Sequence, residues 1–248
     1  MSYWGQLMFQ DSISLTMKNL VLYHNLALLV LVFIMVMVGY FLVIFVFNGS
    51  VMRGLSCRNS SSNELLESLW TLFPVVWLLF LAGPSLKILY LMEMYSSEYG
   101  MSLKVIGHQW YWSYDYVYSC PWFSAGEDGE LEFDSYMVPT AELDGSDSVY
   151  RLLEVDSRFV LPSSENIRVL VGSEDVMHCW TLPALGVKVD AVPGRLNMLN
   201  VYSDHVGVVY GQCSEICGAN HSFMPIVGEF ISRKMFDMWW LCQVTEVA

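Results

Sequence analysis

A short segment near the C-terminus gathers side chains that bind soft metal ions. Cys213, Cys217, His221 and Met224 lie within twelve positions, and His178 lies further upstream. Thiolate and thioether sulfur are soft ligands, and imidazole suits copper well. A methionine also argues against a structural zinc site, which is normally built from cysteine and histidine alone. The segment therefore predicts a copper site rather than a site for magnesium, calcium or manganese.

A disulfide is the competing interpretation of the same two cysteines. Cys213 and Cys217 are four residues apart, wider than the two-residue spacing of common zinc knuckles and redox disulfides. An oxidising compartment outside the membrane would permit the bond. The chain would then be a membrane-anchored ectodomain stapled by disulfides, which its six cysteines allow. In that case His178, His221 and Met224 would be accidental neighbours, so the metal site is favoured.

Two long apolar segments are predicted to cross a membrane. Hydrophobic residues make up 54% of the chain and charged residues only 15%, which departs from the composition of soluble domains. Val21 to Phe47 carries no formal charge and exceeds the roughly 20 residues that span a bilayer. Leu65 to Met92 is a second predicted span, in which Lys87 can snorkel to the headgroups. The first segment is too long for a cleaved signal peptide, and Pro74 and Pro84 predict a bend in the second.

The loop between the spans predicts the orientation in the membrane. It carries Arg53 and Arg58 beside a polar linker, Asn59 to Asn63. Basic residues accumulate in short loops on the cytoplasmic or matrix side. The loop should therefore face the matrix or cytoplasm, with both chain termini on the opposite side.

After Met92 the pattern changes to short alternating runs separated by turn residues, which predicts an antiparallel β sandwich or small barrel. Gly126 to Glu132 is predicted to be a solvated loop and Lys234 to Cys242 a short helix. The predicted domains are residues 1–92, with the two spans, and residues 93–248. The clearest candidate strands are Ser102 to Tyr118, Ile167 to Val171, Val187 to Val189, Val206 to Tyr210 and Ile226 to Ile231.

The outer domain is strongly acidic. From Glu93 onward there are 22 acidic and 8 basic residues, and the whole chain has a net charge of -13. Acidity is a common way for a protein to stay soluble. It also creates a field that steers a basic partner, an effect that salt weakens. We predict no nucleic-acid partner.

Four longer motifs resemble subunit 2 of the haem-copper cytochrome c oxidases. The resemblance runs from the two helices nearly to the C-terminus, and the last motif is highly specific. It implies the fold of that family, a two-helix transmembrane hairpin followed by an all-β cupredoxin-like Greek-key barrel. The motifs are Gly107 to Tyr114 (GHQWYWSY), Phe133 to Met137 (FDSYM), Asp190 to Asn197 (DAVPGRLN) and Tyr210 to Ile226 (YGQCSEICGANHSFMPI).

The resemblance implies a dinuclear copper centre of the CuA type. Two cysteines would bridge the two ions, each of two histidines would bind one ion, and a thioether and a backbone carbonyl would be weak axial ligands. The Glu215 side chain would bind a magnesium ion shared with the catalytic subunit, although it could instead pair with a neighbouring base. The copper ligands are, in that order, Cys213 and Cys217, His178 and His221, Met224, and Glu215.

Three further positions take roles from the same resemblance. Trp110 would be the point where an electron arrives from cytochrome c, within an aromatic run that otherwise predicts the core of a β domain. Asp175, with Glu174, would belong to the acidic docking surface. Glu67, at the membrane edge of the second helix, would lie at the mouth of a proton path, and ordinary solvation explains it equally well.

The implied function is electron transfer within a terminal respiratory oxidase. The subunit would accept electrons from cytochrome c and pass them to the haem and copper of catalytic subunit 1, which reduces O2 to water with coupled proton pumping. We expect a mitochondrial inner-membrane protein with both termini and the copper domain in the intermembrane space. This expectation rests on the short length, on the first apolar segment being interpreted as a retained anchor rather than a cleaved signal, and on the lack of a fused Cys-x-x-Cys-His haem motif. A quinol oxidase subunit of the same shape lacks copper, and the intact ligand set argues against it.

Two places depart from the family pattern. Cys120 to Glu132 is longer than the usual loop and adds acidic residues, which bears on the docking face. Cys179, beside His178, is an unfamiliar choice and a spare thiol open to oxidation. Like Cys57, Cys120 and Cys242, it is interpreted as an unpaired small hydrophobe.

Overall fold

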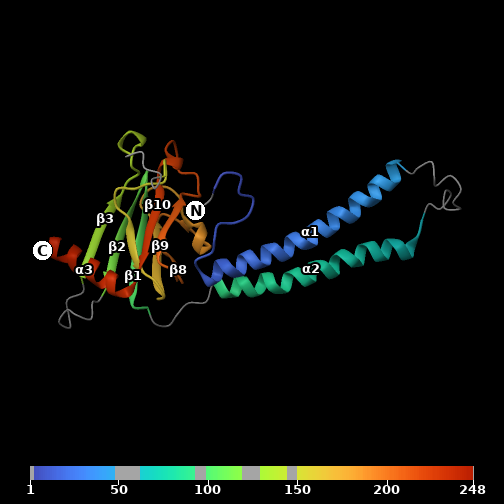
Figure 1. Ribbon diagram of the computed structural model, residues 1–248, viewed down its shortest axis with the longest axis horizontal. Helices are drawn as coiled ribbons and strands as arrows, with labels where there is room; N and C mark the ends of the chain where they lie inside the picture. The colour runs from blue at the N-terminus through green and yellow to red at the C-terminus, as the bar shows by residue number, and fades with distance from the viewer. Residues whose placement is uncertain (1–2, 48–61, 93–98, 119–128, 144–149, 248) are drawn as a thin grey trace. The chain divides into compact units, whose positions relative to one another are not determined.

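The computed structural model describes residues 3–47, 62–92, 99–118, 129–143 and 150–247 (Figure 1). One compact unit comprises Met1–Lys18 and Glu93–Ala248, and the other comprises Asn19–Met92. The division of the chain between residues 92 and 93 made from the sequence stays a prediction. The loop with Arg53 and Arg58 lies outside the described residues, as do Cys57, Cys120 and most of the segment that follows Cys120.

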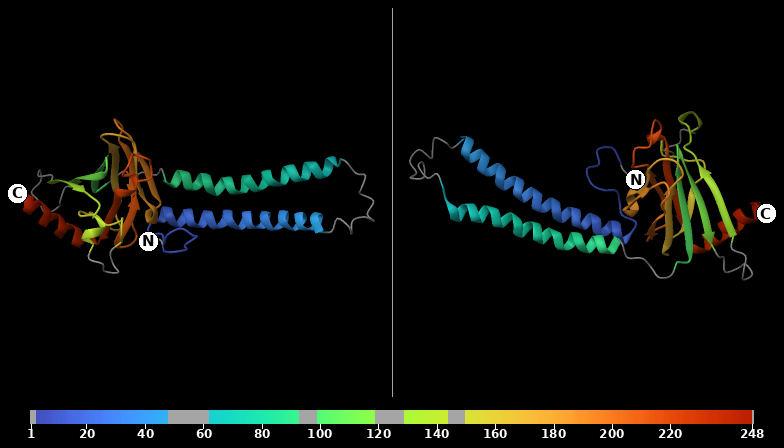
Figure 2. Two further views of the ribbon diagram at one scale, coloured as in Figure 1. Left: turned by 90° about the horizontal axis from the view of Figure 1, so that it is seen from above. Right: turned by 180° about the vertical axis from the view of Figure 1, so that it is seen from behind.

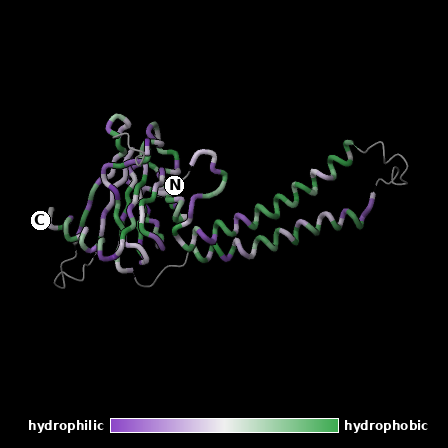
Figure 3. Tube along the Cα trace, viewed as in Figure 1, coloured by the Kyte–Doolittle hydropathy of each residue, from purple (hydrophilic) through white to green (hydrophobic). Residues whose placement is uncertain are grey.

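The smaller unit is built from two long apolar helices, the first of which begins four residues before it, in the larger unit. α1 spans Leu15–Phe47 and α2 spans Glu64–Met92, and both are long and apolar enough to cross a membrane. Figure 2 shows them side by side, and Figure 3 shows hydrophobic residues along both. The rings of Phe33 and Trp77 meet between them, with centroids 6.3 Å apart. The two predicted spans are confirmed, and α2 continues as one helix through both of its prolines.

Among the described residues of the larger unit, ten strands form three sheets. The sheet orders are β3-β2-β1-β5-β8, β4-β10-β9 and β6-β7. The short helices are η3 (Thr140–Glu142), η4 (Pro183–Leu185) and η5 (His221–Phe223), and α3 (Arg233–Val247) ends the chain. The strands are β1 (Met101–His108), β2 (Tyr111–Tyr118), β3 (Gly129–Ser135), β4 (Phe159–Pro162), β5 (Ile167–Ser173), β6 (His178–Leu182), β7 (Val187–Ala191), β8 (Asn197–Val201), β9 (Gly207–Gln212) and β10 (Pro225–Ile231).

The predicted all-β fold is confirmed, with three corrections. β1 pairs in parallel with β5, and β10 pairs in parallel with β4, so the domain is not wholly antiparallel. Alternation in the sequence shows which residues of a strand face inward, but it does not show in which direction the neighbouring strand runs. The candidate strand Ser102 to Tyr118 is two strands, because the chain turns at Gln109 and Trp110. Gly129 to Glu132, predicted as loop, belongs to β3, where Leu131 is buried and pairs with Tyr116. One inward residue between acidic neighbours is too weak a signal for a strand.

The aromatic run forms the core, as predicted. Trp112, Tyr114, Tyr116 and Tyr118 on β2 are all buried. α3 packs beside β3 and β4 and is longer than the predicted helix. Its first residue, Arg233, donates hydrogen bonds to the Tyr118 hydroxyl, Asp237 and Glu165. The polar residues of the site lie elsewhere in the domain, at the start of β6 and just beyond the end of β9.

Candidate metal centre

The candidate ligands come from two places in the larger unit. β9 and β10 are antiparallel partners, and the loop that joins them carries Cys213, Cys217 and His221 and ends at Met224. His178 is the first residue of β6, a strand whose five side chains are all buried. Because β6 packs across β9, the structure brings this histidine to the cysteine loop 35 residues further along the chain.

The candidate ligand atoms converge in a small volume. The Cys213 Sγ lies 4.0 Å from His178 Nδ1 and 3.3 Å from the backbone oxygen of Glu215. The Cys217 Sγ lies 3.5 Å from His221 Nδ1 and 3.5 Å from Met224 Sδ. His178, Cys213 and Cys217 offer ligand atoms that all lie within 4.8 Å of one another.

This arrangement fits a metal ion better than a disulfide. Both cysteines have free thiols. Bonds from a transition metal to nitrogen or sulfur are about 2.0–2.3 Å long, so two ligands of one ion lie at most about 4.6 Å apart. The separations between neighbouring candidate atoms fall in that range. Two thiols, two imidazoles and a thioether form a soft donor set of the kind that copper prefers.

The thiol pair is electrostatically asymmetric without metal. Burial opposes ionisation of Cys213, but hydrogen bonds with His178 and with the backbone at Cys179 and Glu215 outweigh it, and the pKa of the Cys213 thiol is lowered to about 7. Burial and the nearby charge of Cys213 raise the pKa of Cys217 to about 12. Since the thiolate is the form that binds metal, one ligand is ready to bind near neutral pH.

A second layer of residues orients His178. The Asp175 Oδ1 lies 2.8 Å from His178 Nε2, and its Oδ2 accepts a hydrogen bond of 2.6 Å from the Gln109 backbone N–H. Burial lowers the pKa of His178, but Cys213 and Asp175 outweigh burial and raise it. With Nε2 held by the carboxylate, Nδ1 faces the cysteine loop. Sequence reasoning placed Asp175 on a docking surface, and its contact with His178 could not be seen in the sequence.

Gln109 was missed at the sequence level. Its Nε2 donates a 2.8 Å hydrogen bond to the Cys217 backbone oxygen, so the β1–β2 turn is fastened to the cysteine loop. Trp110, next to it, is half-buried and packs over Gly218: a Cβ on this glycine would lie 3.1 Å from Trp110 Cζ2. Gly218 also has a φ of +125°, which L side chains rarely adopt. The Trp110 ring therefore packs directly against the cysteine loop at Gly218.

Three further residues complete the account of the positions singled out in the sequence. The Glu215 side chain is half-buried, and Glu67 is exposed in the first turn of α2, in the other unit. Cys179 is buried, and its Sγ lies 3.5 Å from Thr181 Oγ1 rather than beside the ligand atoms. Burial raises the pKa of Cys179 to about 11. Its thiol is therefore protected from the oxidation suggested by its position in the sequence.

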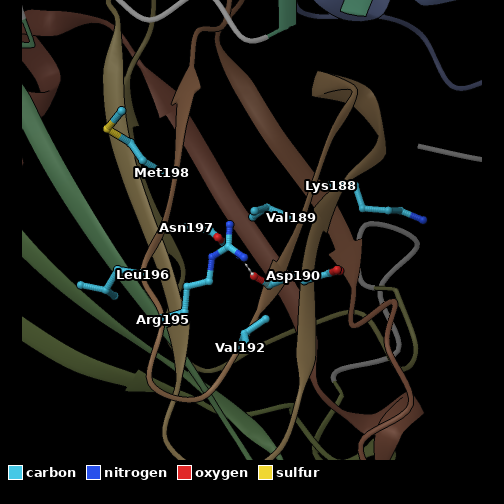
Figure 4. Close-up of a pocket in the computed structure, with 8 residues that line it drawn as sticks. All are labelled: Lys188, Val189, Asp190, Val192, Arg195, Leu196, Asn197 and Met198. Atoms are coloured by element: carbon cyan, nitrogen blue, oxygen red, sulfur yellow. Dashed lines mark hydrogen bonds between the residues drawn. The ribbon is translucent and has the colours of Figure 1, made fainter.

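A cavity of about 650 Å³ between β7 and β8 lies outside this cluster (Figure 4). Its wall is formed largely by Asp190 to Asn197, and the Asn197 Nδ2 donates a 2.6 Å hydrogen bond to the Asp190 backbone oxygen. None of the candidate ligands lines it. The candidate metal site is therefore identified by its donor atoms and not by the size of a cavity.

Comparison with known proteins gives consistent results along the whole chain. Residues 101–231 match the family model described as cytochrome c oxidase subunit II, periplasmic domain, and residues 2–88 match the model of its transmembrane domain. Cytochrome c oxidase subunit 2 of Drosophila subobscura is 50% identical over 96% of this chain and 97% of that protein, and the Drosophila ambigua protein gives the same values. The crystal structure of the periplasmic domain of subunit II of cytochrome oxidase from Bradyrhizobium japonicum matches with a TM-score of 0.51 and 40% identity, over 61% of this chain and 98% of that one.

Proposed function

This chain belongs to the cytochrome c oxidase subunit II family, and we propose that it accepts electrons from cytochrome c at a dinuclear copper centre. The observation that carries the proposal is the convergence of two free thiols, two imidazoles and a thioether, with three of the ligand atoms within 4.8 Å. The electrons pass to the haem and copper of the catalytic subunit, where O2 is reduced to water and protons are pumped.

In this proposal the two copper ions would be held by the thiolates of Cys213 and Cys217, the imidazoles of His178 and His221, the Met224 thioether and the Glu215 carbonyl. Bound copper supplies a one-electron store shared across the thiolates. The protein holds these ligands rigidly: four of them are buried, and the Trp112 indole N–H donates a 3.3 Å hydrogen bond to the Met224 backbone oxygen. A rigid ligand shell limits the change in geometry that accompanies electron transfer.

The proposal extends to magnesium, to a proton path and to the membrane. The Glu215 carboxylate, free of the copper because only its carbonyl is used, takes a magnesium ion at the contact with the catalytic subunit; carboxylates are the ligands that this hard ion prefers. Glu67 lies at the mouth of a proton path. The protein lies in the mitochondrial inner membrane, with both termini and the copper domain in the intermembrane space.

Replacement of Trp110 tests the route of the electron. In the assembled oxidase, we expect Trp110→Ala to slow reduction of the copper centre by cytochrome c by about two orders of magnitude, as when a positioning group is lost. The copper spectrum should stay nearly unchanged, because Trp110 packs on Gly218 and is not among the candidate ligands. Trp4→Ala is the matched control, since Trp4 is fully exposed in the N-terminal segment. An altered copper spectrum in Trp110→Ala would instead assign Trp110 a structural role.

Replacement of Asp175 and of Glu174 distinguishes a role in positioning a copper ligand from a role in docking cytochrome c. Both are acidic, but Asp175 holds His178, whereas the Glu174 side chain is 68% exposed and lies 3.5 Å from His108. We expect Asp175→Asn to weaken copper binding by about 10- to 100-fold, the usual cost of losing an outer partner of a metal-bound histidine. Glu174→Gln should leave copper affinity unchanged and alter only the salt-dependent association with cytochrome c. Equal copper affinities for both variants, measured by competition with a chelator, would remove Asp175 from the site.

A further inference from the structure

A groove lies between the two helices of the smaller unit, near one end of both. Its volume is about 210 Å³, and it is lined by four residues of α1, from Asn19 to Leu26, and four of α2, from Pro84 to Leu91. All eight belong to the unit Asn19–Met92. The groove is therefore a feature of the helix pair itself.

The lining combines a polar group of side chains with an apolar floor. Asn19 and Tyr23 are four residues apart on α1, which places them on one face of the helix, and Lys87 faces the same groove from α2. Leucines and Ile88 supply the rest of the surface, interrupted by Pro84. An ammonium, an amide and a phenol thus stand beside a strip of aliphatic side chains.

Lys87 has no ion-pair partner among the described residues, whereas Lys18, the other lysine of α1 and α2, pairs with Asp204. An ammonium at the edge of an apolar helix retains its charge most easily near an anion or at the headgroup layer. The groove therefore contains one uncompensated positive charge.

The groove lies near the ends of the two helices, where helices longer than the bilayer core reach the headgroup layer. α1 has 33 residues and α2 has 29, which correspond to about 50 Å and about 44 Å of helix, and the hydrocarbon core of a bilayer is about 30 Å thick. Both helices must extend beyond the core. Asn19 is four residues from the start of α1, and Lys87 is five residues from the end of α2, so the polar end of the groove reaches the headgroup layer.

We propose that this groove binds one anionic phospholipid. The Lys87 ammonium and hydrogen bonds from the Asn19 amide and the Tyr23 hydroxyl hold the phosphodiester, and the upper part of an acyl chain lies along Leu22 and Leu26. Lysine is a common phosphate ligand, and basic pockets between transmembrane helices bind anionic headgroups. This site is independent of the copper centre, and a helix of another subunit would have to bring a carboxylate to satisfy Lys87 equally well.

The test uses the full chain in nanodiscs of phosphatidylcholine with a minor fraction of phosphatidylglycerol. Native mass spectrometry after transfer to detergent should find one phosphatidylglycerol retained per chain. We expect Lys87→Gln to lower this retention about five-fold, the contribution of one basic residue near an anionic surface, and Lys87→Arg to restore it. Lys18→Gln, which removes a lysine already paired with Asp204, is the charge-matched control and should retain the lipid.

Two further arms distinguish a lipid from a free anion and from a protein partner. Leu26→Trp fills the apolar floor while leaving Lys87 in place, so it should also reduce retention. Added inorganic phosphate should not displace the lipid. Equal retention in the parent chain, Lys87→Gln and Leu26→Trp, or displacement by inorganic phosphate, would overturn the proposal, as would a protein helix filling the groove in the assembled oxidase.

Discussion

Cys217→Ser is expected to destroy the dinuclear copper centre. The Cys217 Sγ lies 3.5 Å from both His221 Nδ1 and Met224 Sδ, and it belongs to the cluster that includes Cys213. A serine hydroxyl is a hard donor that stays protonated near neutral pH, so it cannot replace a bridging thiolate for a soft ion. The parent chain should hold two coppers that share one unpaired electron, and the variant should lose at least one copper together with the shared signal.

The control for this result lies on β6. Cys179 is also buried and is adjacent in sequence to His178, but its Sγ points to Thr181. Cys179→Ser should therefore keep both coppers and an unchanged electron paramagnetic resonance spectrum. If Cys217→Ser retained two coppers with the parent spectrum, Cys217 would not be a ligand. If the parent chain held no copper, and Cys213 and Cys217 formed a disulfide even after reducing reconstitution, the alternative of a membrane-anchored ectodomain stapled by disulfides would be favoured.

The chemistry of the site was readable in the sequence because its ligands are nearly contiguous. Four of the side chains lie on one loop, and the nature of their donor atoms is independent of folding. The contacts of Gln109 and Asp175 were not readable. Gln109 reaches Cys217 because the β1–β2 turn meets the β9–β10 loop, and Asp175 faces His178 because of the conformation of the short segment before β6. The hydrogen bond from Gln109 joins it to a residue far along the chain. Asp175 is close to His178 in sequence, but the sequence does not show which way its side chain faces.

Some strands were predicted from the sequence and others were missed, depending on whether their side chains alternate between buried and exposed. The half-buried strand β5 was recognised because its buried residues alternate. β4 and β6 were missed because every one of their side chains is buried, and short apolar runs without alternation do not distinguish a strand from other buried segments. β6 is the strand that carries His178. The least predictable strand is thus the one that completes the site.

Packing between β6 and β9 links the stability of the domain to the metal site. Gly211, on β9, lies two residues before Cys213, and Thr181, on β6, lies three residues after His178. A Cβ at Gly211 would lie 1.9 Å from the Thr181 backbone oxygen and 3.2 Å from Leu182 Cδ2. Real Cβ atoms do not approach a backbone oxygen so closely, and neither backbone can turn away as a side chain could. Any side chain at residue 211 must therefore separate the two strands.

Gly211→Ala is consequently expected to lower the free energy of unfolding by about 3 kcal/mol, the upper part of the usual cost of overpacking. Tryptophan fluorescence during denaturant unfolding of the full chain in detergent measures the change. Gly100→Ala is the matched control, because its Cβ would meet only Glu165 Oε2, at 3.9 Å. Separation of the strands should also move His178 away from Cys213. Copper affinity and the free energy of unfolding should therefore both fall in Gly211→Ala, and both should stay unchanged in Gly100→Ala. An unfolding midpoint equal to that of the control would mean that β6 and β9 can move apart without cost, and the rigid ligand shell inferred for electron transfer would lose its physical basis.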